Sequence, residues 1–168
     1  MIRILLSLVL LMPSLAFADS IDEKVNAIYT RMSEGYASLD VNLMKKVYDS
    51  GYVYVAPGKH DPVWKGLEDI LFKDGRFFNK MKERNNRIGI NFRVIDRKKT
   101  NQMVADVGFY VIQITSPEQE IDTSYGKFLI TSTLQSNGHW AFYSDMDVDA
   151  LQKDYDEAKK ISELKYDQ

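Results

Sequence analysis

Apolar side chains recur at two spacings along the chain, and the change of spacing divides it into a helical part and a strand-forming part. Spacings of three and four residues predict helices near residues 20–38, from Asp40 to Gly51, and over 67–81. From Arg87 onward apolar and polar residues alternate, which predicts strands of a half-buried sheet. The pattern therefore predicts the α+β class, with helices first and an antiparallel meander after them.

Turn-forming residues set the limits of the predicted strands. A short strand over 52–56 ends at a Pro-Gly pair, and residues 63–65 are a candidate for a second one. A polar turn, a connecting loop and the hairpin signal Ser136-Asn137-Gly138 separate the later strands. These strands are predicted over residues 88–94, 103–115, 124–135 and 139–147. Apolar positions from Leu151 to Ile161 predict a closing helix with a highly charged end.

Residues 1–18 have the three parts of a secretory signal peptide. Arg3 gives a positive start, residues 4–12 form a short apolar run, and Ala16-Phe17-Ala18 supplies the small residues that cleavage requires. The run is shorter than the ~20 residues of a spanning helix. We therefore expect cleavage after Ala18, a periplasmic or secreted location and no stable membrane insertion of the mature chain. An uncleaved anchor or a buried helix is the alternative. The remainder divides into one domain over 19–150 and a charged helix or tail over 151–168.

Composition excludes several kinds of chemistry. The chain has no cysteine, so it has no disulfide, thiolate metal site or cysteine nucleophile. His60 and His139 are its two histidines, which argues against a multi-histidine metal centre. The 22 basic and 24 acidic residues nearly balance at a net charge of −2, so nothing in the charge favours nucleic-acid binding. We expect no metal and no cofactor.

Four fragments, taken in order, carry a family resemblance. They are YASLDVNLMKKVYDSGYVYVAPG, WKGLEDI at the start of the third helix, GKFL in the penultimate strand, and NGHWAFYSDMD. In order and spacing they resemble the nuclear transport factor 2-like superfamily, in particular its SnoaL-like and ketosteroid-isomerase-like branches. The resemblance implies a cystatin-like, cone-shaped antiparallel sheet that curves around the N-terminal helices and leaves an internal pocket. It also implies a homodimer that pairs through the sheet.

The resemblance can be checked at individual residues. The positions of the catalytic aspartate and the oxyanion-stabilising tyrosine of ketosteroid isomerase hold Ala56 and Met32, so that mechanism lacks its base and its donor. The SnoaL-like cyclase pattern is nearer, with Asp145 after Trp140 and then Gln152, although the Trp-to-Asp spacing is one residue longer.

Strand alternation places Asp145 on the face opposite Trp140, Phe142 and Met146, which predicts an outward-facing, structural aspartate. A bulge would reverse this. Asp145 and Asp106 are nevertheless the best candidates for a catalytic acid or base. Asp106 interrupts an apolar run, so it either faces solvent, which we favour, or lies in the pocket. The candidate ligand-binding residues are aromatic, since such rings give apolar walls with polar tips: Tyr54, Trp64, Tyr110, Tyr125 and Trp140.

These observations favour an exported protein that binds a small, largely apolar molecule in an aromatic-lined pocket. One alternative is a cofactor-independent isomerase, cyclase or hydrolase that uses a pocket aspartate. Another is a dimeric interaction domain without a ligand. A binding protein needs aromatic walls alone, whereas an enzyme also needs a buried carboxylate within hydrogen-bond reach of the pocket.

Overall fold

The computed structural model describes residues 20–56, 58 and 62–164. The predicted signal peptide over 1–18 and His60 lie outside the described residues. The elements follow in the order α1 (Ile21–Ser38), α2 (Val41–Met44), β1 (Tyr48–Val55), β2 (Val63–Lys65), α3 (Leu67–Glu83), β3 (Arg87–Lys99), β4 (Met103–Thr115), β5 (Ile121–Leu134), β6 (Trp140–Asp149), α4 (Gln152–Glu157) and β7 (Ser162–Leu164). The predicted α+β class is confirmed.

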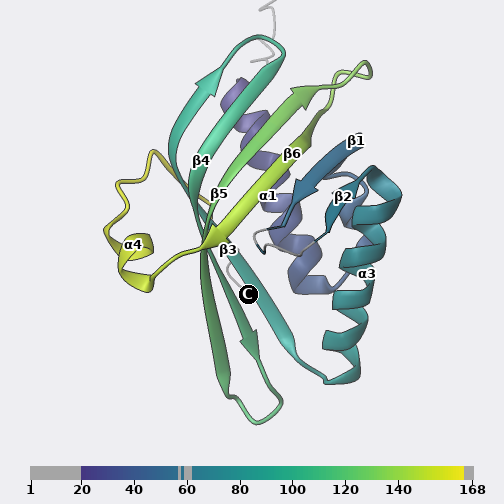
Figure 1. The fold of residues 1–168 in the computed structure, drawn as a ribbon, viewed down its shortest axis with the longest axis vertical. Coiled ribbons are helices and arrows are strands. Elements are labelled where there is room, and N and C mark those ends of the chain that lie inside the picture. Colours follow the sequence, from purple (N-terminus) through teal and green to yellow (C-terminus); the bar gives the residue numbers. More distant parts are fainter. Residues whose placement is uncertain (1–19, 57, 59–61, 165–168) are drawn as a thin grey trace, which may run out of the picture.

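One curved sheet carries the fold. Its strand order is β2-β1-β6-β5-β4-β3-β7, and the long strands β3 to β6 form the predicted antiparallel meander. Strand β1 pairs with β6 in parallel, which joins the first strand of the chain to the last strand of the meander. Helices α1 and α3 lie on one side of the sheet and α4 on the other (Figure 1). The main core lies between the sheet and α1 and α3.

Helix α1 begins at a capping box. The Ser20 hydroxyl accepts a hydrogen bond from the Glu23 backbone N–H, and the Glu23 carboxylate accepts one from the Ser20 N–H. The buried side chains of α1 recur at helical spacing and include Val25, Ile28 and Tyr29. The Tyr29 ring packs edge-to-face against aromatic rings of β3 and β6, so one face of α1 is fixed against the sheet.

Two glycines let aromatic rings lie flat across the neighbouring strand. Gly108 pairs with Phe128 across β4 and β5, and Gly126 pairs with Tyr110 across the same two strands. A Cβ atom at either glycine would collide with the paired ring. The rings therefore cover backbone that glycine leaves bare, an arrangement that favours sheet curvature.

Two predicted elements are wrong at their ends. The predicted helix from Asp40 to Gly51 is a single turn, and the chain is already in β1 at Tyr48. The closing helix ends at Glu157 and not near Ile161, and β7 then adds to the sheet edge beside β3. In both places a pairing with a strand far along the sequence replaces the local helical preference.

Strand β6 contains a β-bulge at Tyr143. Phe142 is paired with Ser132 and Ser144 with Thr131, so Tyr143 has no partner of its own on β5. One extra residue reverses the alternation of the residues that follow it. Trp140 and Phe142 are buried before the bulge, whereas Met146 and Val148 are exposed after it. The second half of β6 therefore presents its odd-numbered residues to the interior.

Candidate functional site

An interior cavity of about 130 Å³ lies between the concave face of the sheet and helices α1 and α3. Its lining combines apolar side chains from α1, α3, β3, β4 and β5 with a group of polar ones. The polar groups are five tyrosines, two aspartates and one lysine: Tyr36, Tyr48, Tyr52, Tyr54, Tyr110, Asp145, Asp147 and Lys73.

Asp147 anchors two of the tyrosines. The hydroxyl of Tyr54 on β1 donates to its Oδ1 at 2.7 Å, and the hydroxyl of Tyr110 on β4 donates to its Oδ2 at 2.5 Å. Each carboxylate oxygen of Asp147 therefore accepts a hydrogen bond, one from β1 and the other from β4. The ring of Tyr110 is held in place from behind by Gly126, which has no side chain to displace it.

Asp145 lies beside this group with few partners. The Tyr52 hydroxyl is 3.5 Å from its Oδ2, which is long for a hydrogen bond, and its buried Oδ1 has no partner among the described residues. Burial, and then the charge of Asp147, raise the pKa of Asp145 to about 8, while Lys73 and the Tyr52 hydroxyl act in the opposite direction. The carboxyl group is therefore mainly protonated at neutral pH.

The bulge at Tyr143 explains why Asp145 faces inward, against the expectation from simple alternation. Without the extra residue, Asp145 would lie on the outer face of the sheet, the exposed face that Met146 occupies in the structure. The spacing from Trp140 to Asp145 is one residue longer than in the SnoaL-like pattern, and the bulge accommodates that extra residue. Trp140 and Asp145 therefore both face the inside of the sheet.

Tyrosine hydroxyls dominate the rest of the cavity wall. Burial is the main cause that raises the pKa of Tyr48, Tyr52 and Tyr54 far above the ordinary value, and nearby carboxylates add to it. These groups stay protonated and act as hydrogen-bond donors. Tyr48 donates to Asp74 of α3 at 3.0 Å, and burial raises the pKa of that aspartate as well.

Lys73 lies at the edge of the cavity. Its ammonium nitrogen is 4.8 Å from the centroid of the Tyr54 ring and 3.6 Å from Oδ1 of Asp74. The side chain is one-third exposed, so its charge is partly hydrated. This lysine contributes a cation–π contact at the wall of the cavity.

Asp106 belongs to a separate, structural ion pair. It is 1% exposed, so it does not face solvent as we favoured, and it does not line the cavity. The Arg97 guanidinium donates to both of its oxygens, at 2.7 and 2.8 Å, and the Tyr29 hydroxyl donates at 2.9 Å. Arg97 also pairs with Asp22 of α1 at 3.2 Å. The network joins α1 to β3 and β4.

The structure brings together only part of the aromatic set. Tyr54 and Tyr110 line the cavity beside Asp145. Trp64 pairs with Tyr54 across β1 and β2, but its side chain does not line the cavity. Tyr125 packs against Tyr155 of α4 on the other face of the sheet, and Trp140 is buried in the core beyond the cavity.

Sequence reasoning missed Asp147, Tyr52 and Lys73. Asp147 follows Asp145 by two residues, so strand alternation alone puts the two carboxylates on one face. The signal for Lys73 was weaker, because a lysine on a helix is usually solvated. Met32, at the position of the absent isomerase tyrosine, also lines the cavity.

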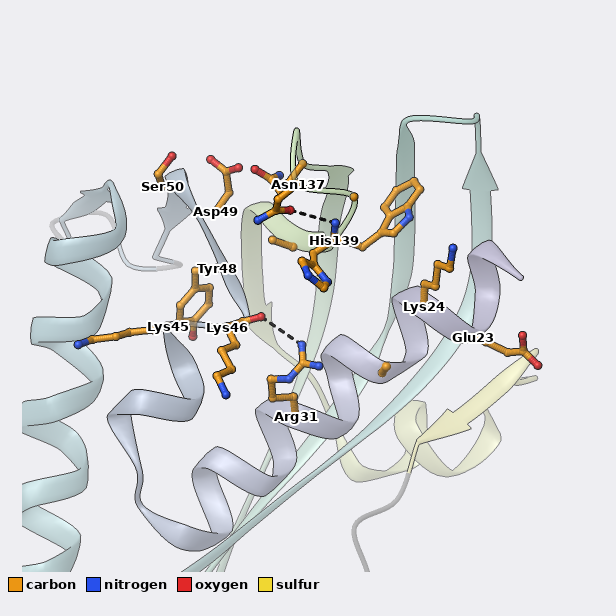
Figure 2. A pocket seen from close by; sticks show the side chains of 15 residues that line it. Glu23, Lys24, Arg31, Lys45, Lys46, Tyr48, Asp49, Ser50, Asn137 and His139 are labelled. Atoms are coloured by element: carbon orange, nitrogen blue, oxygen red, sulfur yellow. Dashed lines mark hydrogen bonds between the residues drawn. The ribbon is translucent and has the colours of Figure 1, made fainter. Parts of the chain in front are cut away.

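A larger surface groove of about 1280 Å³ lies beside α1. Lys24 and Arg31 project from α1 toward the turn that carries Asn137 and His139 (Figure 2). Arg31 donates to the Lys46 carbonyl at 3.2 Å. The lysines that line the groove are exposed, and so is His139. Among the described residues, no buried polar atom that lacks a hydrogen-bond partner belongs to the lining of the groove. The smaller interior cavity is therefore the candidate site.

The part of the chain that the structure describes shows neither a metal-binding cluster nor a membrane-spanning helix. No group of three or more histidine, aspartate or glutamate side chains there is arranged to hold a metal ion. No helix there is long and apolar enough to cross a membrane.

Comparison with known proteins shows similarity in structure only. No protein-family model and no curated protein matches the chain. ActVI-ORFA from Streptomyces coelicolor has a TM-score of 0.65 at 8% identity, over 75% of this chain and 94% of that one.

Two further solved structures are similar. A nuclear transport factor 2-like superfamily protein from Salmonella enterica gives a TM-score of 0.59 at 8% identity, over 76% of this chain and 89% of that one. A ketosteroid isomerase-like protein from Erwinia carotovora gives 0.57 at 11% identity, over 76% and 95%. Identities this low establish the fold alone, and the chain therefore has the nuclear transport factor 2-like fold.

Proposed function

We propose that the protein binds a small organic molecule in the interior cavity. The observation that carries this proposal is the buried Oδ1 of Asp145, which has no partner among the described residues and belongs to a side chain that lines the cavity. A buried polar atom without a partner is costly, and a ligand that donates a hydrogen bond to it removes that cost.

The size and walls of the cavity describe the ligand. At about 130 Å³ it is slightly smaller than the ~150 Å³ cavity that accepts benzene in an engineered protein. Phe92, Phe128 and Ile130 offer apolar surface, and the carboxyl group of Asp145 offers one polar anchor. The ligand is therefore compact and largely apolar, with one polar group.

Proton transfer is the second candidate function, and the protonation of Asp145 favours it. Because its pKa is about 8, this carboxyl group can both give and take a proton near neutral pH. Tyr52, 3.5 Å away, supplies a hydroxyl that can stabilise a developing negative charge. This arrangement suits a cofactor-independent isomerase, cyclase or hydrolase. An interaction domain without a ligand gives no reason for an unpartnered carboxylate in a cavity.

We also propose that residues 1–18 direct export and are cleaved after Ala18. The charged start, the apolar run and the small residues before the cleavage point support this. The binding domain then works in the periplasm or outside the cell.

One purification tests both proposals. The full chain is expressed in a Gram-negative host, the periplasmic fraction is purified, and native mass spectrometry measures the protein with any bound small molecule. We expect a chain that begins at Asp19 and a bound molecule that Asp145→Leu no longer retains. Asp122→Asn, at an exposed aspartate outside the cavity, is the control and keeps the molecule.

Export and ligand binding can each be contradicted without the other. A full-length chain confined to the cytoplasm contradicts export. Equal retention of the same molecule by the wild type and by folded Asp145→Leu contradicts binding in the cavity.

A further inference from the structure

We propose that the ligand of the interior cavity is a small organic cation, an amine or methylated ammonium group, held by Asp145 and Asp147 and by the surrounding tyrosine rings. This inference rests on the proposed function, because it specifies the chemistry of the molecule that the cavity binds.

The charges around the cavity favour a positive ligand. Asp145 and Asp147 lie two residues apart on β6, and both line the cavity. Lys73 is the one basic side chain among the described lining residues. Its ammonium lies 3.6 Å from Asp74, so a carboxylate of α3 already balances it. Neither carboxyl group of β6 forms a salt bridge with a basic side chain among the described residues, although the more distant charge of Lys73 lowers the pKa of Asp145.

Four of the five tyrosine hydroxyls of the cavity are directed at carboxyl groups, which disfavours an anion. Tyr54 and Tyr110 donate to Asp147, Tyr48 donates to Asp74, and Tyr52 is directed at Asp145. A ligand carboxylate or phosphate would have to compete with these acids for the hydroxyls and would meet their negative charge. A cation needs no donor from the wall.

The aromatic walls suit a cation that carries apolar groups. Ring faces are negative at their centre and attract ammonium groups, and cages of such rings recognise methylated ammonium ions. Within this structure an ammonium group already lies over one ring of the wall, where Lys73 is 4.8 Å from the Tyr54 centroid. Methyl groups on the ligand nitrogen would contact Phe92 and Phe128, which also line the cavity.

Binding of a cation would also change the protonation of Asp145. A positive charge beside its carboxyl group favours the ionised form, so a proton leaves Asp145 for solvent as the cation enters. Affinity for the cation should then rise with pH and level off above about 8, where Asp145 is already ionised.

The groups around Asp145 come from five elements. Those with an ionisable side chain are Asp147 of β6, Tyr52 and Tyr54 of β1, Tyr110 of β4, Lys73 and Asp74 of α3, and Tyr29 and Tyr36 of α1. The tyrosines keep their protons in this range because their pKa values are raised. Asp74, whose pKa is also raised, contacts Tyr48 and Lys73. Comparing the wild type with Asp145→Asn separates the part of the pH dependence that comes from Asp145 from the part that comes from Asp74.

Titration calorimetry with a matched pair of probes tests the inference. Trimethylammonium and tert-butyl alcohol each have three methyl groups and one hydrogen-bond donor, but only the first carries a charge at pH 7. We expect the wild-type protein to bind trimethylammonium at least tenfold more tightly than the alcohol at pH 7. The heat of binding should vary with the ionisation enthalpy of the buffer, because Asp145 releases close to one proton per site.

Substitutions make the test independent of misfolding. Lys73→Gln removes the competing ammonium, so affinity for trimethylammonium should increase severalfold and by a larger factor than affinity for the alcohol. Asp145→Asn should weaken cation binding about tenfold and abolish its pH dependence. The exposed Asp122→Asn control should match the wild type.

Each result decides between the two proposals. Equal or tighter binding of tert-butyl alcohol overturns the cation inference and leaves binding in the cavity supported. Binding of neither probe to folded wild-type protein also overturns the cation inference. A neutral or anionic molecule that co-purifies and depends on Asp145 does the same, yet it upholds the proposed function.

Discussion

Asp106, which is fully buried, and Asp145, which is partly buried, show how differently one residue type behaves in two settings. Asp106 has two guanidinium donors and a tyrosine donor, so its charge is compensated. Asp145 has one long contact and an oxygen without a partner. The first is an anchor for the fold, whereas the second keeps unused binding capacity at the expense of stability.

We predict that Asp145→Asn stabilises the protein at alkaline pH, by about 1–3 kcal/mol at pH 9. The folded chain disfavours ionised Asp145, and the amide carries no charge to desolvate. Urea denaturation of wild type and variant at pH 5 and pH 9 measures the difference.

Because the pKa of Asp145 is raised in the folded state, its contribution to the free energy of unfolding decreases with pH. From the ordinary value of 3.8 up to about 8, the folded state holds the Asp145 proton more often than the unfolded state does. The free energy of unfolding that this group contributes therefore falls as pH rises, and the loss is complete above about 8. A stability difference between wild type and Asp145→Asn that is the same at both pH values would contradict the prediction.

For Asp106 we predict the opposite behaviour, a large loss of stability. Asp106→Leu leaves the Arg97 guanidinium, whose side chain is 6% exposed, with only the partly exposed Asp22 as partner. We expect a loss of about 3 kcal/mol in urea denaturation. The double variant Arg97→Met/Asp106→Leu should recover more than half of this, since it removes both buried charges.

A double variant no more stable than Asp106→Leu would show that the ion pair is not the source of the loss. Ligand binding supplies a second check, because Asp106 lies outside the cavity lining. Folded Asp106→Leu should bind the cavity ligand as the wild type does.

At the scale of elements, β4 and β5 position Tyr110 through the missing side chain of Gly126. We predict that Gly126→Ala displaces the Tyr110 ring, because the new Cβ atom would collide with it. We expect a loss of about 1–3 kcal/mol in stability and weaker binding in the cavity, measured by urea denaturation and calorimetry.

Gly89→Ala in β3 is the matched control. A Cβ atom there has no neighbour within 4 Å, and the glycine is also within a strand. This variant should be neutral or slightly stabilising. A Gly126→Ala protein as stable as Gly89→Ala would contradict the close packing of Tyr110 on Gly126.

Elements with a strong local pattern were predictable from the sequence, and those fixed by distant partners were not. The predicted strand over 103–115 matches β4, because alternation and turn residues are both local signals. The second helix was predicted too long, because Tyr48 pairs with Phe142, far along the chain. The direction of Asp145 depended on one unpaired residue, Tyr143, which alternation cannot reveal.

At the scale of the whole molecule, the outer face of the sheet carries an exposed apolar row. Cross-strand pairing aligns one side chain from each of five adjacent strands. They are Val107, Leu129, Met146, Val55 and Val63, each between 39% and 48% exposed. Contiguous apolar surface of this kind is typical of protein interfaces.

We predict that two copies of the chain pair through this row, which is the homodimer expected from the sequence. Leu129→Lys should shift the mass measured by analytical ultracentrifugation from dimer to monomer, because a charge would be buried within the row. Ile121→Lys, at an exposed apolar residue outside the row, should leave the dimer intact. A wild-type protein that is monomeric at high concentration contradicts this prediction.

The parallel pairing of β1 with β6 has a consequence for how the protein folds. Tyr52 and Tyr54 meet Asp145 and Asp147 across a separation of 93 residues. Contacts between such distant segments form slowly, because a long loop must close before they stabilise anything. The cavity is therefore completed only after the ribosome has released nearly the whole domain. A nascent chain that lacks β6 would hold neither carboxylate, and Tyr29 of α1 would lack its contact with Phe142 of this strand.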